Sequence, residues 1–322
     1  MIQVEQLVKR FGPKVAVNRI SFQVERGEVL GFLGPNGAGK STTMRMITGF
    51  IPPSEGSVTV GDHPILEQPI QAKRLMGYLP ESAPCYPDMT VYGFLDFAAE
   101  IRGISGGDRK KAIHRVVDLC FLESVLHQSV DTLSKGYRHR TCFAQSIIHD
   151  PDVLIMDEPT DGLDPNQKHE VRGIIKRMGE KKAIIFSTHI LEEVEAVCSR
   201  AIIIDRGEIV ANGTPEELKV RSRHAGAVQL RLGGVSGAIA KDKLGQLSGA
   251  DQVTLVSDDA TCSEVVVQPK QRDSAVLSEQ IADLILQEGW RVLQFSCREG
   301  RLDEVFRDIT KPDTIKEGVQ AA

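Results

Sequence analysis

Residues 31–42 read GFLGPNGAGKST, a stretch that holds four glycines and a lysine. Gly34, Gly39, Lys40 and Ser41 have the spacing of a phosphate-binding loop, with four residues between the two glycines. An apolar run leads into the loop, and a helical pattern, KSTTMRMITGFI, follows it. This strand–loop–helix context favours a phosphate loop over a flexible glycine-rich turn.

The residue types of the loop suit phosphate binding. Glycines let backbone N–H groups curl around phosphate oxygens, and the helix that follows directs its positive end toward them. We expect Lys40 to reach the outer phosphates and Ser41 to offer its hydroxyl to Mg²⁺.

Two further strands are predicted to end in polar side chains beside this loop. VLIMDEPT (153–160) ends in Asp157 and Glu158, and KAIIFSTH (182–189) ends in His189. Ligands of open α/β sheets bind at the carboxyl ends of strands. We therefore expect Asp157 to hold Mg²⁺, Glu158 to polarise an attacking water and His189 to reach a phosphate. An acidic turn and a merely packed histidine are the alternatives.

The order of elements predicts two domains. Short apolar runs after residue 151 alternate with helical segments, which indicates a parallel sheet covered by helices, preceded by a helical block at about 89–150. After residues 220–226 a second unit is predicted, with strands at 227–232, 252–256, 264–269 and 290–296 and helices at 274–289 and 301–310.

The ordered motifs resemble the ATP-binding subunit of an ABC transporter over about residues 2–220. They are Phe11, GPNGAGKST (34–42), Glu81, LSKGY (133–137), VLIMDEPTDGLDP (153–165) and His189. GYLPESAP (77–84) and RLDEVFRDIT (301–310) resemble the ATPases of ABC-2-type exporters, including gliding-motility-type subunits. The resemblance implies an α/β P-loop nucleotide-binding domain at 1–220, with a mixed sheet core and a helical subdomain at about 85–150. A smaller α+β accessory domain follows at 225–322.

The resemblance assigns a role to each matching residue, with ATP and Mg²⁺ as cofactors. It implies that Phe11 stacks on adenine, unless this side chain is simply packed at a strand end. Glu158 is the implied catalytic base, His189 the γ-phosphate sensor and Asp164 an acid at a dimer interface. The implied ATP-binding set is Phe11, Gly34, Pro35, Asn36, Gly37, Ala38, Gly39, Lys40, Ser41, Thr42, Glu81, Ser134, Lys135, Gly136, Asp157 and Asp164, with Ser41, Glu81 and Asp157 on Mg²⁺.

Three positions depart from the family pattern. Glu81 stands where the family usually has glutamine, which adds a negative charge near phosphates unless the side chain points into solvent. Lys135 replaces the first glycine of the signature motif, and Tyr137 replaces its glutamine. A lysine at a helix start is unfavourable for the helix dipole, yet it suits a position that meets a γ-phosphate.

The chain has one phosphate loop and one signature, so the resemblance implies a second ATP-binding subunit, expected to be an identical copy. It also implies a separately encoded membrane permease, which contacts the helical subdomain. Tyr86, Met89, Tyr92 and Phe94 could line a groove for it, although an ordinary helical core is the alternative.

Composition limits the other possibilities. The 322 residues carry a net charge of −5, which does not favour nucleic acid as a partner. The six cysteines form no CxxC pair, so we expect buried free thiols in a reducing compartment and no metal knuckle. The N-terminus lacks the apolar run of a signal peptide, and no run is long enough to span a membrane. We expect a protein at the cytoplasmic face of the cell (inner) membrane, held there by the permease.

Two other functional classes fit less well. An ABC-type ATPase that acts on nucleic acid or ribosomes usually has two nucleotide domains or a long coiled coil, and neither is present in this sequence. A scaffold that binds nucleotide without hydrolysis predicts a broken catalytic position, whereas Glu158 and His189 are intact. The 225–322 domain shows no catalytic constellation, which leaves a packing appendage, a regulatory role or a partner contact.

Overall fold

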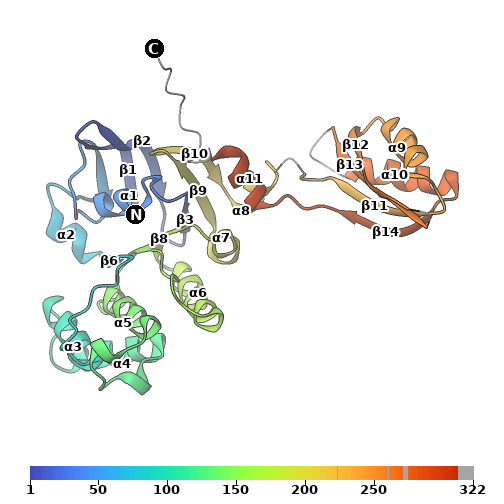
Figure 1. Cartoon of the computed structure of the whole chain (residues 1–322). Helices are drawn as coiled ribbons and strands as arrows, with labels where there is room; N and C mark the ends of the chain where they lie inside the picture. Colours follow the sequence, from blue (N-terminus) through green and yellow to red (C-terminus); the bar gives the residue numbers. More distant parts are fainter. Residues whose placement is uncertain (223, 260, 271–274, 311–322) are drawn as a thin grey trace, which may run out of the picture. The chain divides into compact units, whose positions relative to one another are not determined.

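The computed structural model describes residues 1–222, 224–259, 261–270 and 275–310 (Figure 1). It divides into two compact units, Met1–Pro215 together with Thr310, and Glu216–Ile309. The division falls before the 220–226 segment that the composition suggested. Residues 223, 260, 271–274 and 311–322 of the expected linker and C-terminal domain lie outside the described residues.

A six-stranded sheet forms the centre of the first unit, in the order β10-β9-β3-β8-β7-β6. The strands are β3 (Val29–Leu33), β6 (Met76–Leu79), β7 (Val153–Asp157), β8 (Ala183–Thr188), β9 (Arg200–Asp205) and β10 (Glu208–Gly213). The pairings β9–β3, β3–β8, β8–β7 and β7–β6 are parallel, and only β10 is antiparallel. Every residue of β3, β7 and β8 is buried, as expected for strands covered on both faces.

A second, antiparallel sheet has the order β2-β1-β4-β5. It consists of β1 (Ile2–Phe11), β2 (Lys14–Val24), β4 (Glu55–Val60) and β5 (His63–Pro64). One hydrophobic cluster joins this sheet to the central sheet through α1 (Lys40–Ile47), where Met44 and Met46 pack with Leu30, Phe32 and Ile155. This core holds both β3 and α1 in place, so the two ends of the loop between them are fixed in position.

Helices cover the other side of the central sheet. They are α3 (Val91–Ile101), α4 (Gly106–Cys120), α5 (Lys135–Ile147), α6 (Pro165–Gly179) and α7 (Leu191–Val197), with short 3₁₀ turns at Glu123–Val125 and Val130–Thr132. The short helix α2 (Pro69–Arg74) instead packs, through Ala72, into the core that contains α1. Figure 1 shows α3, α4 and α5 gathered as one block. A continuous core connects this block to the sheet through Phe143, Leu154 and Phe186. The predicted α/β fold with a mixed sheet and a helical subdomain is confirmed.

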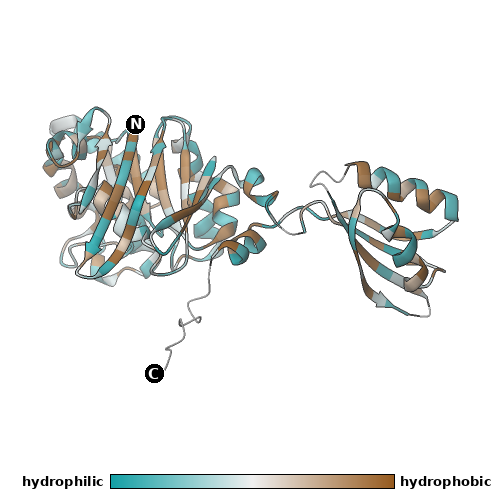
Figure 2. Cartoon of the chain, turned by 90° about the horizontal axis from the view of Figure 1, so that it is seen from above, coloured by the Kyte–Doolittle hydropathy of each residue, from teal (hydrophilic) through white to brown (hydrophobic). Residues whose placement is uncertain are grey.

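The second unit is an α+β sandwich. It contains β11 (Val228–Gly233), α9 (Gly237–Gly245), β12 (Ala250–Asp258), β13 (Cys262–Pro269), α10 (Ala275–Glu288) and β14 (Arg291–Cys297), with α8 (Pro215–Lys219) before and α11 (Leu302–Ile309) after. The strand order β12-β13-β11-β14 is antiparallel throughout, which makes this a split βαβ unit of the ferredoxin-like kind. Figure 2 shows hydrophilic and hydrophobic residues alternating along its strands, and the apolar side packs on α9 and α10 through Leu244, Leu277 and Ile281.

Sequence patterns did not predict β6, α2 or α9. Only four residues form β6, and its pairing with β7 rather than its own alternation defines it. A glycine begins α9 and another ends it, and the helix has little amphipathic pattern. Among the described residues, no helix is both long and apolar enough to cross a membrane.

Candidate active site

The loop between β3 and α1 curves sharply, and glycine is required at two of its positions. A Cβ on Gly34 would lie 2.5 Å from the carbonyl oxygen of Ile204. At Gly39, where φ is +109°, a Cβ would lie 2.6 Å from the carbonyl oxygen of Ala16. Both distances are too short for a side chain, so these glycines let the loop lie against β9 and β2.

Lys40 folds back over this loop. Its Nζ donates to the carbonyl oxygens of Gly34 at 2.7 Å and Pro35 at 3.2 Å, and it lies 3.9 Å from Glu158 Oε1. The lysine is 6% exposed. Burial lowers its pKa, while the charges of Glu158 and Asp157 act in the opposite direction. The ammonium group therefore stands between the loop and the acidic ends of the neighbouring strands.

A cavity of about 430 Å³ opens over the loop, within the size range of small-molecule sites. It is lined by Phe11, Lys14, Ala16, Asn36, Gly37, Gly39, Lys40, Ser41, Thr42, Glu81 and Glu158. Phe11 is 51% exposed, so it is not a packed strand-end side chain, and Lys9 Nζ lies 5.2 Å from the centre of its ring. Glu81 is exposed, and it lines the same cavity as Lys40.

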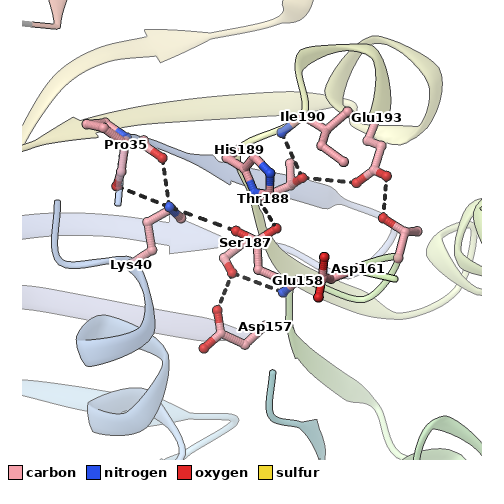
Figure 3. Close-up of polar contacts among 12 residues, drawn as sticks. Pro35, Lys40, Asp157, Glu158, Asp161, Ser187, Thr188, His189, Ile190 and Glu193 are labelled. Carbon is pink, nitrogen blue, oxygen red and sulfur yellow. Dashed lines mark hydrogen bonds and ion pairs between the residues drawn. The ribbon is translucent and has the colours of Figure 1, made fainter. Parts of the chain in front are cut away.

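Asp157 is held by the neighbouring strand. The Ser187 hydroxyl donates to Asp157 Oδ1 and accepts a hydrogen bond from the backbone N–H of Glu158 at 3.3 Å (Figure 3). Asp157 is buried, and the register of β7 and β8 places it directly beside Ser187. One carboxylate oxygen is therefore fixed by the protein, which orients the other.

Glu158 follows the end of β7 with φ at +51°, a conformation that is rare for glutamate and marks local strain. Its Oε2 lies 2.9 Å from Nδ1 of His189, and Figure 3 shows the two side chains directed toward each other. Burial raises the pKa of Glu158, and the hydrogen bond from His189 partly opposes this. A buried carboxylate with raised proton affinity is suited to accept a proton from water.

Sequence reasoning missed a third carboxylate, Glu193 on α7. Thr160 Oγ1 donates to Glu193 Oε1, and Thr188 Oγ1 donates to Oε2 at 3.0 Å. Thr188 Oγ1 in turn accepts from the backbone N–H of Ile190 at 3.0 Å. Glu193 thus ties the loop after β7 to the end of β8, on either side of Glu158 and His189. In the sequence it looked like an ordinary acidic residue in the first turn of a helix.

The signature residues lie on another part of the unit. Ser134 caps α5 by accepting from the backbone N–H of Tyr137 at 3.4 Å, and Gly136 packs against Gln167. Lys135 Nζ donates to Asp161 Oδ2 at 2.8 Å, and this contact lowers the pKa of Asp161.

The expected residues therefore separate into two groups. Phe11, Asn36, Gly37, Gly39, Lys40, Ser41, Thr42, Glu81 and Glu158 line the cavity. Gly34 and Pro35 accept hydrogen bonds from Lys40, and His189 contacts Glu158. Asp157 is connected to Glu158 through Ser187, and Ala38 is buried within the loop. Asp164 caps α6 by accepting from the backbone N–H of Gln167 at 2.9 Å. Asp164, Ser134, Lys135 and Gly136 are not among the described residues that line the cavity.

The fold and this site define a P-loop nucleotide-binding ATPase cassette. The model of the ABC transporter family matches residues 17–161. The linearmycin resistance ATP-binding protein LnrL of Bacillus subtilis (strain 168) is 32% identical over 311 residues, which cover 96% of this chain and 98% of that protein. The chain therefore belongs to the ATP-binding subunits of ABC transporters, and it is an ATPase.

Two further similarities extend this result. The Nod factor export ATP-binding protein I of Cupriavidus pinatubonensis (strain JMP 134 / LMG 1197) is 37% identical over 219 residues, which cover 68% of this chain and 67% of that protein. A solved structure of an ATP-binding subunit of an ABC transporter superposes with a TM-score of 0.64 and 28% identity, covering 68% of this chain and 92% of the other. The likeness to LnrL includes the second unit, whereas these two cover about two thirds of the chain.

Proposed function

We propose that this chain is the ATP-hydrolysing motor of an ABC-2-type exporter. It pairs with a second ATP-binding subunit, expected to be another copy, and drives a separately encoded permease at the cytoplasmic face of the membrane. The observation that carries the proposal is the separation of the two residue groups, because the cavity and the signature lie at different places in one chain. The names of two relatives, one for antibiotic resistance and one for Nod factor export, support export rather than import.

The residues around the cavity fit ATP with Mg²⁺. The exposed ring of Phe11 is available to stack on a base, and the loop amides and Lys40 are placed for phosphates. Ser41, Glu81 and Asp157 supply the oxygen ligands that Mg²⁺ prefers, and Asp157 is already oriented by Ser187. The bound ion would supply electrostatic stabilisation of the transferring phosphoryl group.

Glu158 and His189 would act on the attacking water. Glu158 polarises the water because its carboxylate is buried, has a raised pKa and borders the cavity. His189 holds Glu158 through the 2.9 Å hydrogen bond and is exposed enough to approach the γ-phosphate. The clamp of Thr160, Glu193 and Thr188 keeps the two supporting loops together.

The signature residues would act on the nucleotide of the other subunit. The capped N-terminus of α5 combines a hydroxyl, free amide groups and the positive end of a helix dipole, which suits a γ-phosphate. Lys135 would exchange its exposed partner Asp161 for that phosphate, since the cation in an exposed ion pair is readily released. A symmetric pair of chains would in this way complete two ATP sites.

An apolar surface beside the helical subdomain supports the permease contact. Two adjoining hollows, of about 400 and 630 Å³, share Ile101, Arg102 and Gln145. Phe50, Ile70 and Ile101 are largely exposed there, and clustered exposed apolar side chains of this kind mark protein contacts. Of the aromatic residues singled out in the sequence, Tyr86 and Phe94 both line one hollow, Tyr86 as an exposed side chain and Phe94 as a buried one.

A mixing experiment tests the shared site. Lys40→Ala removes the phosphate loop of one chain, and Ser134→Arg blocks the signature of another; each variant alone should be inactive. In their mixture, half of the dimers contain one intact site, so about a quarter of the wild-type ATPase rate should return. Mixing each variant with itself is the control. A mixture that stays as inactive as its components contradicts the proposed sharing of sites.

A further inference from the structure

Two thiols of the helical subdomain lie in contact, and the proposed function does not use them. The Sγ atoms of Cys85 and Cys142 are 3.0 Å apart. Cys142 belongs to α5 and is buried, whereas Cys85 lies in the segment between β6 and α3 and is partly exposed. Cys85 also lines two surface hollows, one next to Tyr86 and one next to Arg138, so small molecules in solvent can reach it.

The two thiols are chemically different. The hydrogen-bonding contact with Cys142 lowers the pKa of Cys85, and the charge of Arg138 acts in the same direction against the effect of burial. The same contact raises the pKa of Cys142, with burial as a second cause. Burial also raises the pKa of Cys120, to about 12, and that of Cys198. This pattern favours Cys85 as a reactive thiolate and Cys142 as the thiol that resolves it.

We propose that Cys85 and Cys142 form a peroxide-responsive pair that closes to a reversible disulfide and slows ATP turnover. The Cys85 thiolate attacks one oxygen of hydrogen peroxide and becomes a sulfenic acid, while the O–O bond breaks and the other oxygen leaves as hydroxide, which takes up the proton that Cys85 lost on ionisation and becomes water. The Cys142 thiol then attacks the Cys85 sulfur, the S–S bond forms, and the sulfenic oxygen leaves as water. Two thiols are oxidised and one peroxide is reduced to two waters.

The bond would link two parts of the ATPase unit that bear on the ATP site. The Cys85 segment begins near Glu81, which lines the cavity, and α5 begins at the Ser134 cap. A disulfide of about 2.05 Å needs the sulfurs to approach by only about 1 Å from their present contact. It would then hold the segment and α5 in one arrangement. The effect on turnover rests on the proposed function, whereas formation of the bond does not.

A redox role fits the surroundings better than a metal site. Within the part of the chain that the structure describes, no group of three or more His, Cys, Asp or Glu side chains could hold a metal ion. All six cysteines are free thiols, and Cys297 is the exposed one. Cys297 therefore provides a matched control, since it is easily reached by oxidant but lies in the second unit, outside the contact.

The test uses the full-length protein, reduced and then treated with a small excess of hydrogen peroxide. Mass spectrometry of unreduced peptides should find Cys85 joined to Cys142, and thiol titration should show two thiols lost. ATP turnover should fall about tenfold and return with dithiothreitol. Each protein is compared with its own untreated rate.

The variants decide the assignment. Cys85→Ser and Cys142→Ala should not form the Cys85–Cys142 disulfide, and peroxide should not lower their ATP turnover. Cys297→Ser should behave as the wild type. Absence of the Cys85–Cys142 peptide in the wild type overturns the proposal, as does a linkage that leaves turnover unchanged. An equal loss of turnover in Cys85→Ser also overturns it. Failure of the mixing experiment, by contrast, would contradict the shared ATP site. It would not affect whether peptide mapping finds the Cys85–Cys142 disulfide.

Discussion

The cavity side and the signature side of the ATPase unit are built in opposite ways. Around the cavity, Asp157, Glu158 and Lys40 are buried and tied to two neighbouring strands and to the loop itself. On the signature side, Ser134 and Lys135 are exposed; Ser134 caps its own helix, and Lys135 pairs with Asp161, itself exposed, in the loop after β7. The proposed function accounts for this difference if one half of the ATP site is prepared within the chain and the other half is presented to a partner.

Glu158→Gln should show the largest loss of turnover. Removal of a general base lowers the rate about 10²–10⁴-fold, while the neutral side chain keeps the shape of the cavity. The variant should still bind ATP and accumulate as a dimer, which light scattering with ATP and with ADP can measure. Glu180→Gln, at an exposed position, is the control. Full turnover in Glu158→Gln would show that the assignment of the base is wrong.

Lys40→Ala should weaken ATP binding about 10²-fold, because a charge-assisted contact to the phosphates is lost. The affinity can be measured by calorimetry at fixed ionic strength, with Lys110→Ala as an exposed control of equal charge change. Retained affinity would contradict the assignment of the phosphate loop. A loss of ATP affinity seen only in the dimer would mean that the contribution of Lys40 depends on the partner subunit.

Lys135→Ala should lower turnover about tenfold, since one charged contact to a phosphate is worth about 1.5–3 kcal/mol. Asp161→Asn is the matched variant, because it breaks the same exposed ion pair but leaves the lysine available. We expect Asp161→Asn to keep or raise turnover at saturating ATP. Equal losses in both variants would mean that Lys135 serves only to hold Asp161.

Glu193→Gln should have the smallest effect on turnover and a measurable effect on stability. Its two threonine contacts are charge-assisted, so the free energy of unfolding should fall by about 1–2 kcal/mol. Urea unfolding monitors this change, and Glu192→Gln, exposed on the same helix, should stay within about 0.5 kcal/mol of the wild type. A neutral outcome for Glu193→Gln would show that the clamp between the two loops does not stabilise the fold.

The part of the site that could be predicted is the part with local signals. The spacing of Gly34, Gly39 and Lys40 requires a particular turn. Buried strands that end at Asp157 or just before His189 place polar groups at one sheet edge. The same reasoning recovered the parallel sheet, because fully buried strands appear as continuous apolar runs.

The rest depends on contacts between distant segments. Nothing near Glu193 in the sequence distinguishes a buried clamp from a solvated helix start. The pairing of Lys135 with Asp161 needs α5 and the loop before α6 to meet, and the positive φ of Glu158 is set by its position after β7. Similarly, β6 forms because its backbone pairs with the edge of β7. Its four residues are too few to show a strand pattern in the sequence.

The close fit of Gly34 and Gly39 has a consequence for how this protein tolerates mutation. Each glycine rests on a carbonyl oxygen, of Ile204 or of Ala16, and every residue type supplies that atom. A complete substitution scan should therefore be asymmetric: both glycine positions should reject every replacement, while Ala16, which also lines the cavity, should reject only side chains large enough to narrow it. The shape of the ATP loop would then depend on backbone atoms of β2 and β9. The amino-acid sequence of those strands need not show this dependence.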